Sequence, residues 1–191
     1  MHGIRIMAGD LKGRVIPFEN RRFDDADITP QKVKGAIFSM VGEWLHGRSF
    51  LDLYAGSGQI GLEALSRGAT PVVLNEPDPA RGRFIRSCIE SFGPLPSARV
   101  LDLAAEKALA LLHGEGAAFD FIFLDPPYHK GKDAVGPYGD IIETIGSIGL
   151  LSPGGEIIVQ HYSGNTLDEA AGRLTVKSVK RYGKTTLTVY A

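Results

Sequence analysis

One short segment combines an acid, two prolines and an aromatic ring. The sequence FDFIFLDPPYHKG, residues 119–131, begins as an apolar run and continues into Asp125, Pro126, Pro127 and Tyr128. Proline has no backbone N–H to donate and restricts the residue before it, so the strand must end at Asp125 in a stiff, extended turn. Turns that follow strands often carry residues that bind a ligand.

The chemistry that suits this turn is recognition of a planar base with an exocyclic amino group. Asp125 and the Pro126 carbonyl could accept the two N–H bonds of the amine, while Tyr128 stacks on the ring. The lone pair of such an amine is delocalised into the ring, which makes the nitrogen a poor nucleophile. Two acceptors on the amino group would favour a lone pair localised on the nitrogen, and Asp125 could also take the proton that the nitrogen loses. We therefore expect Asp125, Pro126, Pro127 and Tyr128 to be catalytic in methyl transfer to nitrogen. The alternative is a strand that simply ends at two prolines, beside a surface tyrosine.

A glycine-rich motif precedes this segment in the chain. In FLDLYAGSGQIGLEALSRGA, the glycines Gly56, Gly58 and Gly61 follow an apolar strand and begin a helix, and Glu76 comes at the end of the next strand. This is the G-x-G-x-x-G pattern with a downstream acid that is typical of nucleotide cofactor sites. The alternative is a tight turn that binds no ligand.

Asp52, which comes just before the motif, discriminates between the possible cofactors. An anion at this position would repel the pyrophosphate of a nicotinamide dinucleotide and attract an ammonium group. S-adenosylmethionine carries an ammonium and no phosphate, so we expect it to be the cofactor, with Glu76 accepting from its ribose hydroxyls. A solvated acid at the strand end is the alternative for Asp52.

Further cofactor contacts are expected around this motif, from Tyr54, Ala55, Ser57 and Pro77. Asp102, at the end of the third strand of the series, could accept a hydrogen bond from the adenine amino group. A helix N-cap is an equally good interpretation of Asp102.

The elements that must position these residues alternate in type. After residue 48, apolar strands alternate with helical segments, which predicts a doubly wound α/β sheet with parallel strands. Ligands of such sheets bind beyond the carboxyl ends of the strands. The tail, LTVKSVKRYGKTTLTVY, predicts an antiparallel hairpin. Near the N-terminus, IRIMAGDLKGRVIPF predicts a small hairpin, and a helix is expected from an N-cap at Thr29 to about Gly47.

Composition excludes several classes of protein. The 191 residues carry a formal net charge of -1 and a single cysteine, Cys88, which excludes an internal disulfide and a multi-cysteine zinc site. We expect no metal. No apolar run approaches the roughly 20 residues of a membrane span and no signal-peptide pattern is present, so we expect a cytoplasmic protein. The sequence does not indicate an oligomeric state, and a monomer is the default expectation.

Local basic clusters could supply contacts to RNA phosphates. Those expected to bind RNA are in the N-terminal segment and after the proline turn: Arg5, Lys12, Arg14, Arg21, Arg22, Lys130 and Lys132. Lys177, Lys180, Arg181 and Lys184 add charge in the tail. For each residue the alternative is an ordinary solvated charge.

Three segments together, IRIMAGDLKGR, LDLYAGSGQIGLEALSRGA and FLDPPY, resemble the bacterial 16S ribosomal RNA (guanine-N2) methyltransferases in order and spacing. The resemblance implies a Rossmann-like methyltransferase fold with a mostly parallel seven-stranded sheet and an antiparallel C-terminal hairpin. It also implies an N-terminal hairpin extension that contacts RNA, residues 1–27, before a methyltransferase domain, residues 28–191. The implied reaction is methylation of guanine N2 in 16S rRNA, within an assembled or partly assembled small subunit.

The sequence departs from the family pattern at three places. Asp27-Ile28-Thr29 stands where the family has Arg-Pro-Thr, Gly35 replaces a glutamate, and Ala104-Ala105 replaces Asp-Ala or Asn-Ala.

Two other functions compete with rRNA methylation. A DNA amino-methyltransferase, acting on adenine N6 or cytosine N4, shares the proline turn but usually needs a large target-recognition region. A nicotinamide-dependent oxidoreductase, or a catalytically silent nucleotide-binding module, would share the glycine motif.

Overall fold

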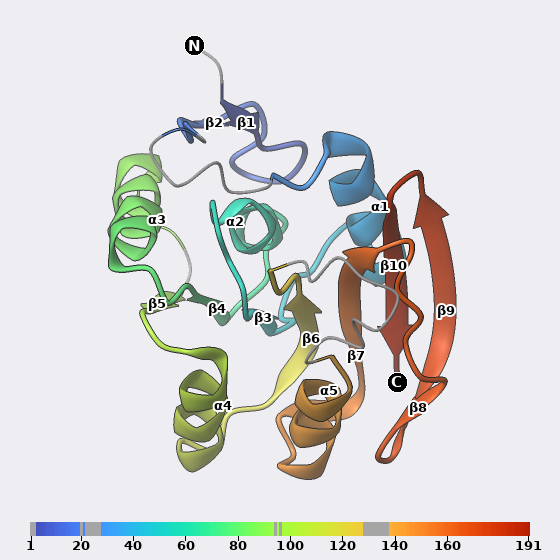
Figure 1. The fold of residues 1–191 in the computed structure, drawn as a ribbon. Helices are drawn as coiled ribbons and strands as arrows, with labels where there is room; N and C mark the ends of the chain where they lie inside the picture. The colour runs from blue at the N-terminus through green and yellow to red at the C-terminus, as the bar shows by residue number, and fades with distance from the viewer. Residues whose placement is uncertain (1–2, 20, 22–27, 94, 96, 128–137) are drawn as a thin grey trace. The chain divides into compact units, whose positions relative to one another are not determined.

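The structure is a computed structural model that describes residues 3–19, 21, 28–93, 95, 97–127 and 138–191. The chain divides into two compact units, residues 1–105 and 106–191. Each unit contains helices and parallel strands, and the second also contains the C-terminal antiparallel hairpin (Figure 1). The predicted α/β fold, with mostly parallel strands, is confirmed.

Three short parallel strands form the sheet of the first unit. They are β3 (Phe50–Asp52), β4 (Val72–Asn75) and β5 (Ala98–Leu101), in the order β5–β4–β3. All residues of β3 and β4 are buried, as expected for parallel strands whose two faces are covered. The register pairs Asp52 with Leu74 and Asn75 with Leu101, so the carboxyl ends of the three strands lie together.

The described residues of the same unit also form the helices α1 (Gln31–Val41), α2 (Gln59–Ser66) and α3 (Pro79–Phe92). The expectation for α1 was wrong at both ends. The helix begins after Pro30, which occupies the cap position without a side-chain hydrogen bond, so Thr29 is not the N-cap. It ends at Val41 because Gly42 has a φ of 107°, and Trp44 is 56% exposed instead of buried.

The N-terminal hairpin is present as predicted. Strand β1 (Ile4–Arg5) pairs antiparallel with β2 (Val15–Ile16), in a register that places Ile4 opposite Ile16. Ile6 and Ile16 are fully buried. The hairpin is therefore packed into a hydrophobic core instead of standing free of the domain.

A buried carboxylate in α2 holds the chain that follows β1. Glu63 is fully buried, and its two oxygens accept hydrogen bonds from the backbone N–H groups of Met7 and Ala8, at 2.9 and 3.0 Å. The same carboxylate forms ion pairs with Lys34 of α1 at 3.2 Å and with Arg67 at 3.1 Å. Sequence reasoning did not identify this cluster, which joins the hairpin segment, α1 and α2.

Ser66, one helical turn further on, completes the attachment. Its hydroxyl donates to the Ala8 carbonyl at 2.6 Å and accepts from the Leu11 N–H at 2.9 Å, while its own carbonyl accepts from Asp10 at 2.7 Å. Gly9 must be glycine here, because its φ is +83° and a Cβ would lie 1.7 Å from the Ser66 carbonyl oxygen. The GDLKGR turn is thus shaped by its contact with α2.

The second unit contains α4 (Ala105–Gly114), β6 (Phe119–Leu124), α5 (Tyr138–Ser147) and four further strands. These are β7 (Leu151–Tyr162), β8 (Ala170–Ala171), β9 (Leu174–Tyr182) and β10 (Thr185–Tyr190). The strand order is β6–β7–β10–β9–β8, with β6 and β7 parallel and the pairs β7–β10 and β9–β10 antiparallel. The two-residue strand β8 was not expected.

We predict that Ser66→Ala lowers the free energy of unfolding by about 1–3 kcal/mol, because it leaves the buried Leu11 N–H without its acceptor. Urea unfolding followed by circular dichroism measures the change. Ser147→Ala is a matched control, since this exposed hydroxyl bonds only to the Thr144 carbonyl one turn earlier, and it should change stability by less than about 0.5 kcal/mol. Equal effects of the two substitutions would contradict the assigned role of Ser66.

Candidate active site

The glycine turn between β3 and α2 has a backbone that only glycine adopts readily at two positions. Gly56 and Gly58 have φ angles of 54° and 75°. The Gly58 N–H donates to the Ala55 carbonyl at 2.7 Å, which closes the turn just before α2 begins at Gln59. A Cβ added to Gly56 would meet nothing within 4 Å. Gly56 therefore borders open space, into which a ligand could approach the backbone.

Gly61, the third glycine of the motif, has a different role. A Cβ at this position would lie 2.4 Å from a methyl carbon of Leu74 on β4. The absence of a side chain lets α2 pack closely on the strand. Two glycines of the motif are thus required by backbone conformation, and the third by helix–strand packing.

Asp52 lies beneath the glycine turn and is not the solvated strand-end acid considered above. It is 1% exposed, and its Oδ2 accepts a hydrogen bond from the Gly61 N–H at 2.9 Å. Its Oδ1 is buried and has no hydrogen-bond partner. Burial raises the pKa of Asp52 to about 7; the nearby Glu76 adds to this rise, whereas the Gly61 bond opposes it. The Oδ1 of Asp52 can therefore accept a hydrogen bond or interact with a cation.

Glu76 binds the glycine turn itself. Its Oε2 accepts from the Gly56 N–H at 2.8 Å, and its Oε1 accepts from the Asp78 N–H at 3.0 Å and faces the Arg81 guanidinium at 3.1 Å. Burial is the main reason that the pKa of Glu76 is raised. The spacing between the first glycine and the acid therefore has a direct structural cause.

Asn75 is a site residue that sequence reasoning missed. It is fully buried, and its Nδ2 donates to the carbonyls of Leu53 and Leu103 at 3.1 and 3.0 Å. Its backbone carbonyl accepts from Ala55 at 2.9 Å. Asn75 thus ties together the ends of β3, β4 and β5. The available signal was a single amide that ends the apolar run VVLN.

Asp102 is held by a helix that the sequence did not connect with it. Its carboxylate forms two hydrogen bonds with the Arg86 guanidinium of α3, at 2.9 and 3.1 Å. The N-cap interpretation is wrong, because α4 begins three residues later, at Ala105. The pairing with Arg86 also weighs against a free acceptor for adenine.

The other residues expected to contact the cofactor lie in the turn or beside it. Ala55 and Ser57 are buried, Tyr54 is half-buried, and Pro77 is exposed between Glu76 and Asp78. No contact in the structure tests a cofactor role for these four residues, so that role stays a prediction.

In the second unit, a buried glutamine fixes the acid of the proline turn. Strand β6 ends at Leu124, and Asp125 follows it as predicted. The parallel register pairs Leu124 with Val159, which brings Asp125 level with Gln160 on β7. Gln160 is 2% exposed, and its Nε2 donates to Asp125 Oδ2 at 2.8 Å. Gln160 was not among the predicted site residues, although it is a polar residue in the apolar run EIIVQ.

The proline turn is described only in part. Pro126 is buried and Pro127 is exposed. Tyr128, Lys130 and Lys132 lie outside the described residues, as does Arg22.

The described basic residues of the N-terminal segment are accessible. Arg5, Lys12, Arg14 and Arg21 are all exposed, and one guanidinium nitrogen of Arg5 donates to the Gly13 carbonyl at 3.2 Å. In the tail, Lys177 pairs with Glu156 of β7. An RNA-binding role for these residues stays a prediction.

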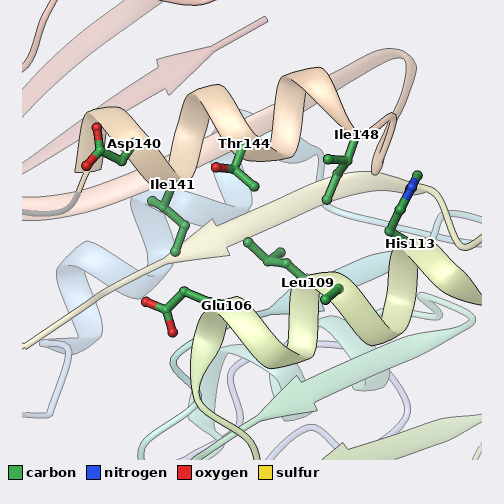
Figure 2. Close-up of a pocket in the computed structure, with 8 residues that line it drawn as sticks. Glu106, Leu109, His113, Asp140, Ile141, Thr144 and Ile148 are labelled. Atoms are coloured by element: carbon green, nitrogen blue, oxygen red, sulfur yellow. The ribbon is translucent and has the colours of Figure 1, made fainter.

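A separate hollow lies between α4 and α5, with a volume of about 470 Å³. Figure 2 shows the side chains that line it. Leu109 lines it from α4, and Ile141 lines it from α5. Among the described residues, none of those predicted to be catalytic or to bind the cofactor lines it. Within the described ranges, no group of three His, Cys, Asp or Glu residues could hold a metal ion. The same residues include no helix long and apolar enough to cross a membrane.

Comparisons with known sequences find relatives over the whole chain. The protein family described as Conserved hypothetical protein 95 matches residues 4–191. A Bacillus subtilis (strain 168) protein named "Putative rRNA methyltransferase YlbH" is 31% identical over 187 residues, which are 98% of each chain. The Escherichia coli (strain K12) protein named Ribosomal RNA small subunit methyltransferase D is 32% identical over 132 residues, or 67% of this chain and 62% of the relative.

Solved structures with a similar fold include proteins that are 25% and 27% identical to this chain. A structure described as "Putative methyltransferase yhhF from Escherichia coli" has a TM-score of 0.79 and 25% identity, covering 99% of this chain and 97% of the other. A hypothetical protein from Thermus thermophilus has a TM-score of 0.77 and 27% identity, covering 97% and 98%. The chain therefore belongs to the Conserved hypothetical protein 95 family, the rRNA methyltransferase family that its three sequence motifs resemble.

Proposed function

We propose that the protein transfers a methyl group from S-adenosylmethionine to the exocyclic N2 of a guanine in 16S rRNA. The observation that carries the proposal is Asp125, an acid at the end of β6 that a buried glutamine holds at 2.8 Å and that two prolines follow. This arrangement suits an amino group attached to a ring. The names of the relatives, rRNA methyltransferase and small-subunit methyltransferase D, support rRNA as the substrate.

The residues of the glycine turn fit S-adenosylmethionine. The buried Oδ1 of Asp52 lacks a partner and could accept from the ligand ammonium, directly or through water. Gly56 leaves space against its backbone, and Glu76 Oε2, which accepts one backbone bond, has a lone pair left for a ribose hydroxyl. When bound, the cofactor supplies an electrophilic methyl group on a sulfonium.

Asp125 would act on the amine of the base. Its carboxylate accepts one N–H of the amino group, the Pro126 carbonyl accepts the other, and the lone pair is then free to point at the methyl donor. Positive charge develops on the nitrogen as the new bond forms, and an adjacent carboxylate stabilises that charge. Asp125 then accepts the proton that the methylated amine releases. Gln160 contributes by fixing the plane of the carboxylate.

The N-terminal segment would bind the RNA. Arg5, Lys12 and Arg14 are exposed on or beside the hairpin, and their charges suit phosphate contacts. The bonds from Glu63 and Ser66 hold this segment on α2, the helix that the glycine turn begins. The proposed substrate is the small ribosomal subunit or an assembly intermediate, because a net charge of -1 gives little general affinity for naked RNA.

Tritium transfer from labelled S-adenosylmethionine tests the proposal. The acceptors are small subunits from cells that lack the modification, free 16S rRNA and duplex DNA. We expect label in subunit rRNA, and a fall of roughly 10²–10⁴-fold for Asp125→Asn, which keeps the shape of the side chain but loses the charge and the proton acceptor. Asp140→Asn, a surface position on α5, is the control. Label mainly in DNA, or an active Asp125→Asn, would refute the assignment.

We predict that Gln160→Ala lowers kcat by about 10- to 100-fold, because Asp125 loses the donor that fixes its carboxylate. Gln160→Glu should be at least as damaging, since it places a second carboxylate against the first. Single-turnover methylation measures the rate, and S-adenosylhomocysteine binding serves as the control. An unchanged rate in both variants would remove Gln160 from the mechanism.

We predict that affinity for S-adenosylhomocysteine, which keeps the ammonium, falls as the pH drops below 7. The pKa of Asp52 is raised to about 7, so acid protonates the carboxyl and removes the anion that the ammonium needs. The fall should approach about tenfold per pH unit, by linkage to one proton. Calorimetry measures it.

Asp52→Asn is the matched control, because its amide oxygen can still accept from Gly61. This variant should bind more weakly at pH 8 and lose most of the pH dependence. Glu76, the other buried acid at the turn, also has a raised pKa and would account for any slope that remains. The same pH slope in wild type and Asp52→Asn would show that Asp52 does not bind the ammonium.

A further inference from the structure

A polar hollow lies over the C-terminal hairpin of the second unit. Its volume is about 430 Å³, within the range of small-ligand sites. Residues from the end of β7, the segment after it, and strands β9 and β10 line it. We call it the hairpin hollow. Its buried lining residues are His161, Asn165, Thr186 and Thr188.

Asn165 carries an unused donor and an unused acceptor in this hollow. The residue is 8% exposed, yet neither its Oδ1 nor its Nδ2 has a hydrogen-bond partner. Its backbone N–H bonds to the Tyr162 carbonyl at 2.9 Å, which helps to fix the segment. A buried amide without partners is costly to a folded protein, so its presence indicates a ligand or ordered water that completes it.

The other buried polar groups of the hollow already have partners. Nδ1 of His161 lies 3.1 Å from the Tyr162 carbonyl and must donate to it, so Nε2 accepts from the Thr188 hydroxyl at 2.9 Å. Burial lowers the pKa of His161, in agreement with a neutral ring. The hydroxyls of Ser163 and Thr186 bond to each other at 2.8 Å. The ligand would therefore be recognised mainly through Asn165.

The rim of the hollow combines an apolar face with charge. Val179 on β9 is 61% exposed and presents an aliphatic surface at the rim. Arg181, two residues along the same strand and hence on the same face, is exposed and also lines the hollow. Glu169 supplies an acceptor on the rim.

We propose that the hairpin hollow binds one nucleotide of the RNA substrate. The Asn165 amide would pair with the donor–acceptor edge of the base, and Val179 would cover its face. Arg181 would bind the phosphate, and Glu169 could accept from a ribose hydroxyl. His161 directly follows Gln160, the residue that holds Asp125, so the hollow and the catalytic acid share the end of β7, although the two side chains point to opposite faces of the strand. The inference rests on the proposed function.

The experiment compares three variants in the subunit methylation assay. Asn165→Ala and Arg181→Ala each remove one contact, and Arg173→Ala removes an exposed arginine that precedes β9 and does not line the hollow. We expect the KM for small subunits to rise about tenfold in the first two variants, equivalent to about 1.4 kcal/mol, with little change for Arg173→Ala. Binding of S-adenosylhomocysteine should stay at the wild-type value.

Thermal unfolding separates recognition from folding. A residue kept for recognition can be removed without loss of stability, so the Tm of Asn165→Ala should equal or exceed that of wild type. A lower Tm, accompanied by a loss of cofactor binding, would assign Asn165 a structural role and overturn the proposal.

The assay also distinguishes the two levels of inference. If the wild-type protein methylates subunits and Asn165→Ala has an unchanged KM, the proposal that the hairpin hollow binds a nucleotide would be refuted, and the proposed function would stand. Equal effects of Arg181→Ala and Arg173→Ala would indicate diffuse charge and overturn the assigned phosphate contact. No wild-type activity on any RNA would remove both proposals.

Discussion

The buried carboxylate of Glu63 is the constraint on which the first unit depends. It lies between two cations, Lys34 and Arg67, and accepts from the backbone of Met7 and Ala8. Burial lowers the pKa of Lys34, and the neighbouring Glu63 opposes that change. Because desolvation cancels much of the attraction in buried ion pairs, the main effect of such a cluster is geometric. The Glu63 cluster fixes the position of the N-terminal segment on α2.

That position has a functional consequence. Helix α2 begins at the glycine turn, where the proposed cofactor site lies, and its last turn holds the segment between β1 and β2. A basic residue on the hairpin is therefore placed relative to the turn by a short, rigid helix. Gly9 brings the same segment closer to α2, because its backbone approaches the Ser66 carbonyl so closely that a Cβ on residue 9 would not fit.

The acids and amides at the strand ends share a common arrangement. Asp52 and Glu76 both accept from the backbone of the glycine motif, and Asn75 donates to the strand ends on either side. In the second unit, the Gln160 amide likewise fixes a polar group at a strand end, by donating to the carboxylate of Asp125. Polar side chains fixed in this way are set before a ligand arrives, which lowers the cost of ordering them during binding and reaction.

Much of this could be predicted from the sequence, because it depends on local pattern. Apolar runs gave β3, β4 and β6, the glycine spacing gave the turn, and the two prolines gave the end of β6. The polar partners were missed since each joins segments that are distant in the chain: Glu63 to Met7, and Gln160 to Asp125. Asp102 was misassigned as a possible N-cap for the same reason, because Arg86 is sixteen residues away from it. The helix α1 was overextended because Trp44 fits its apolar period, although the chain turns at Gly42.

The identity of the methylated nucleoside tests the central claim most directly. Subunit rRNA labelled by the wild-type enzyme would be digested to nucleosides and separated by chromatography against methylated standards, with mass spectrometry to locate the methyl group. The account predicts N2-methylguanosine as the labelled product, from subunits and not from duplex DNA. Label on a ring nitrogen of guanine, on adenine N6 or on a ribose would contradict the role assigned to Asp125 and the proline turn.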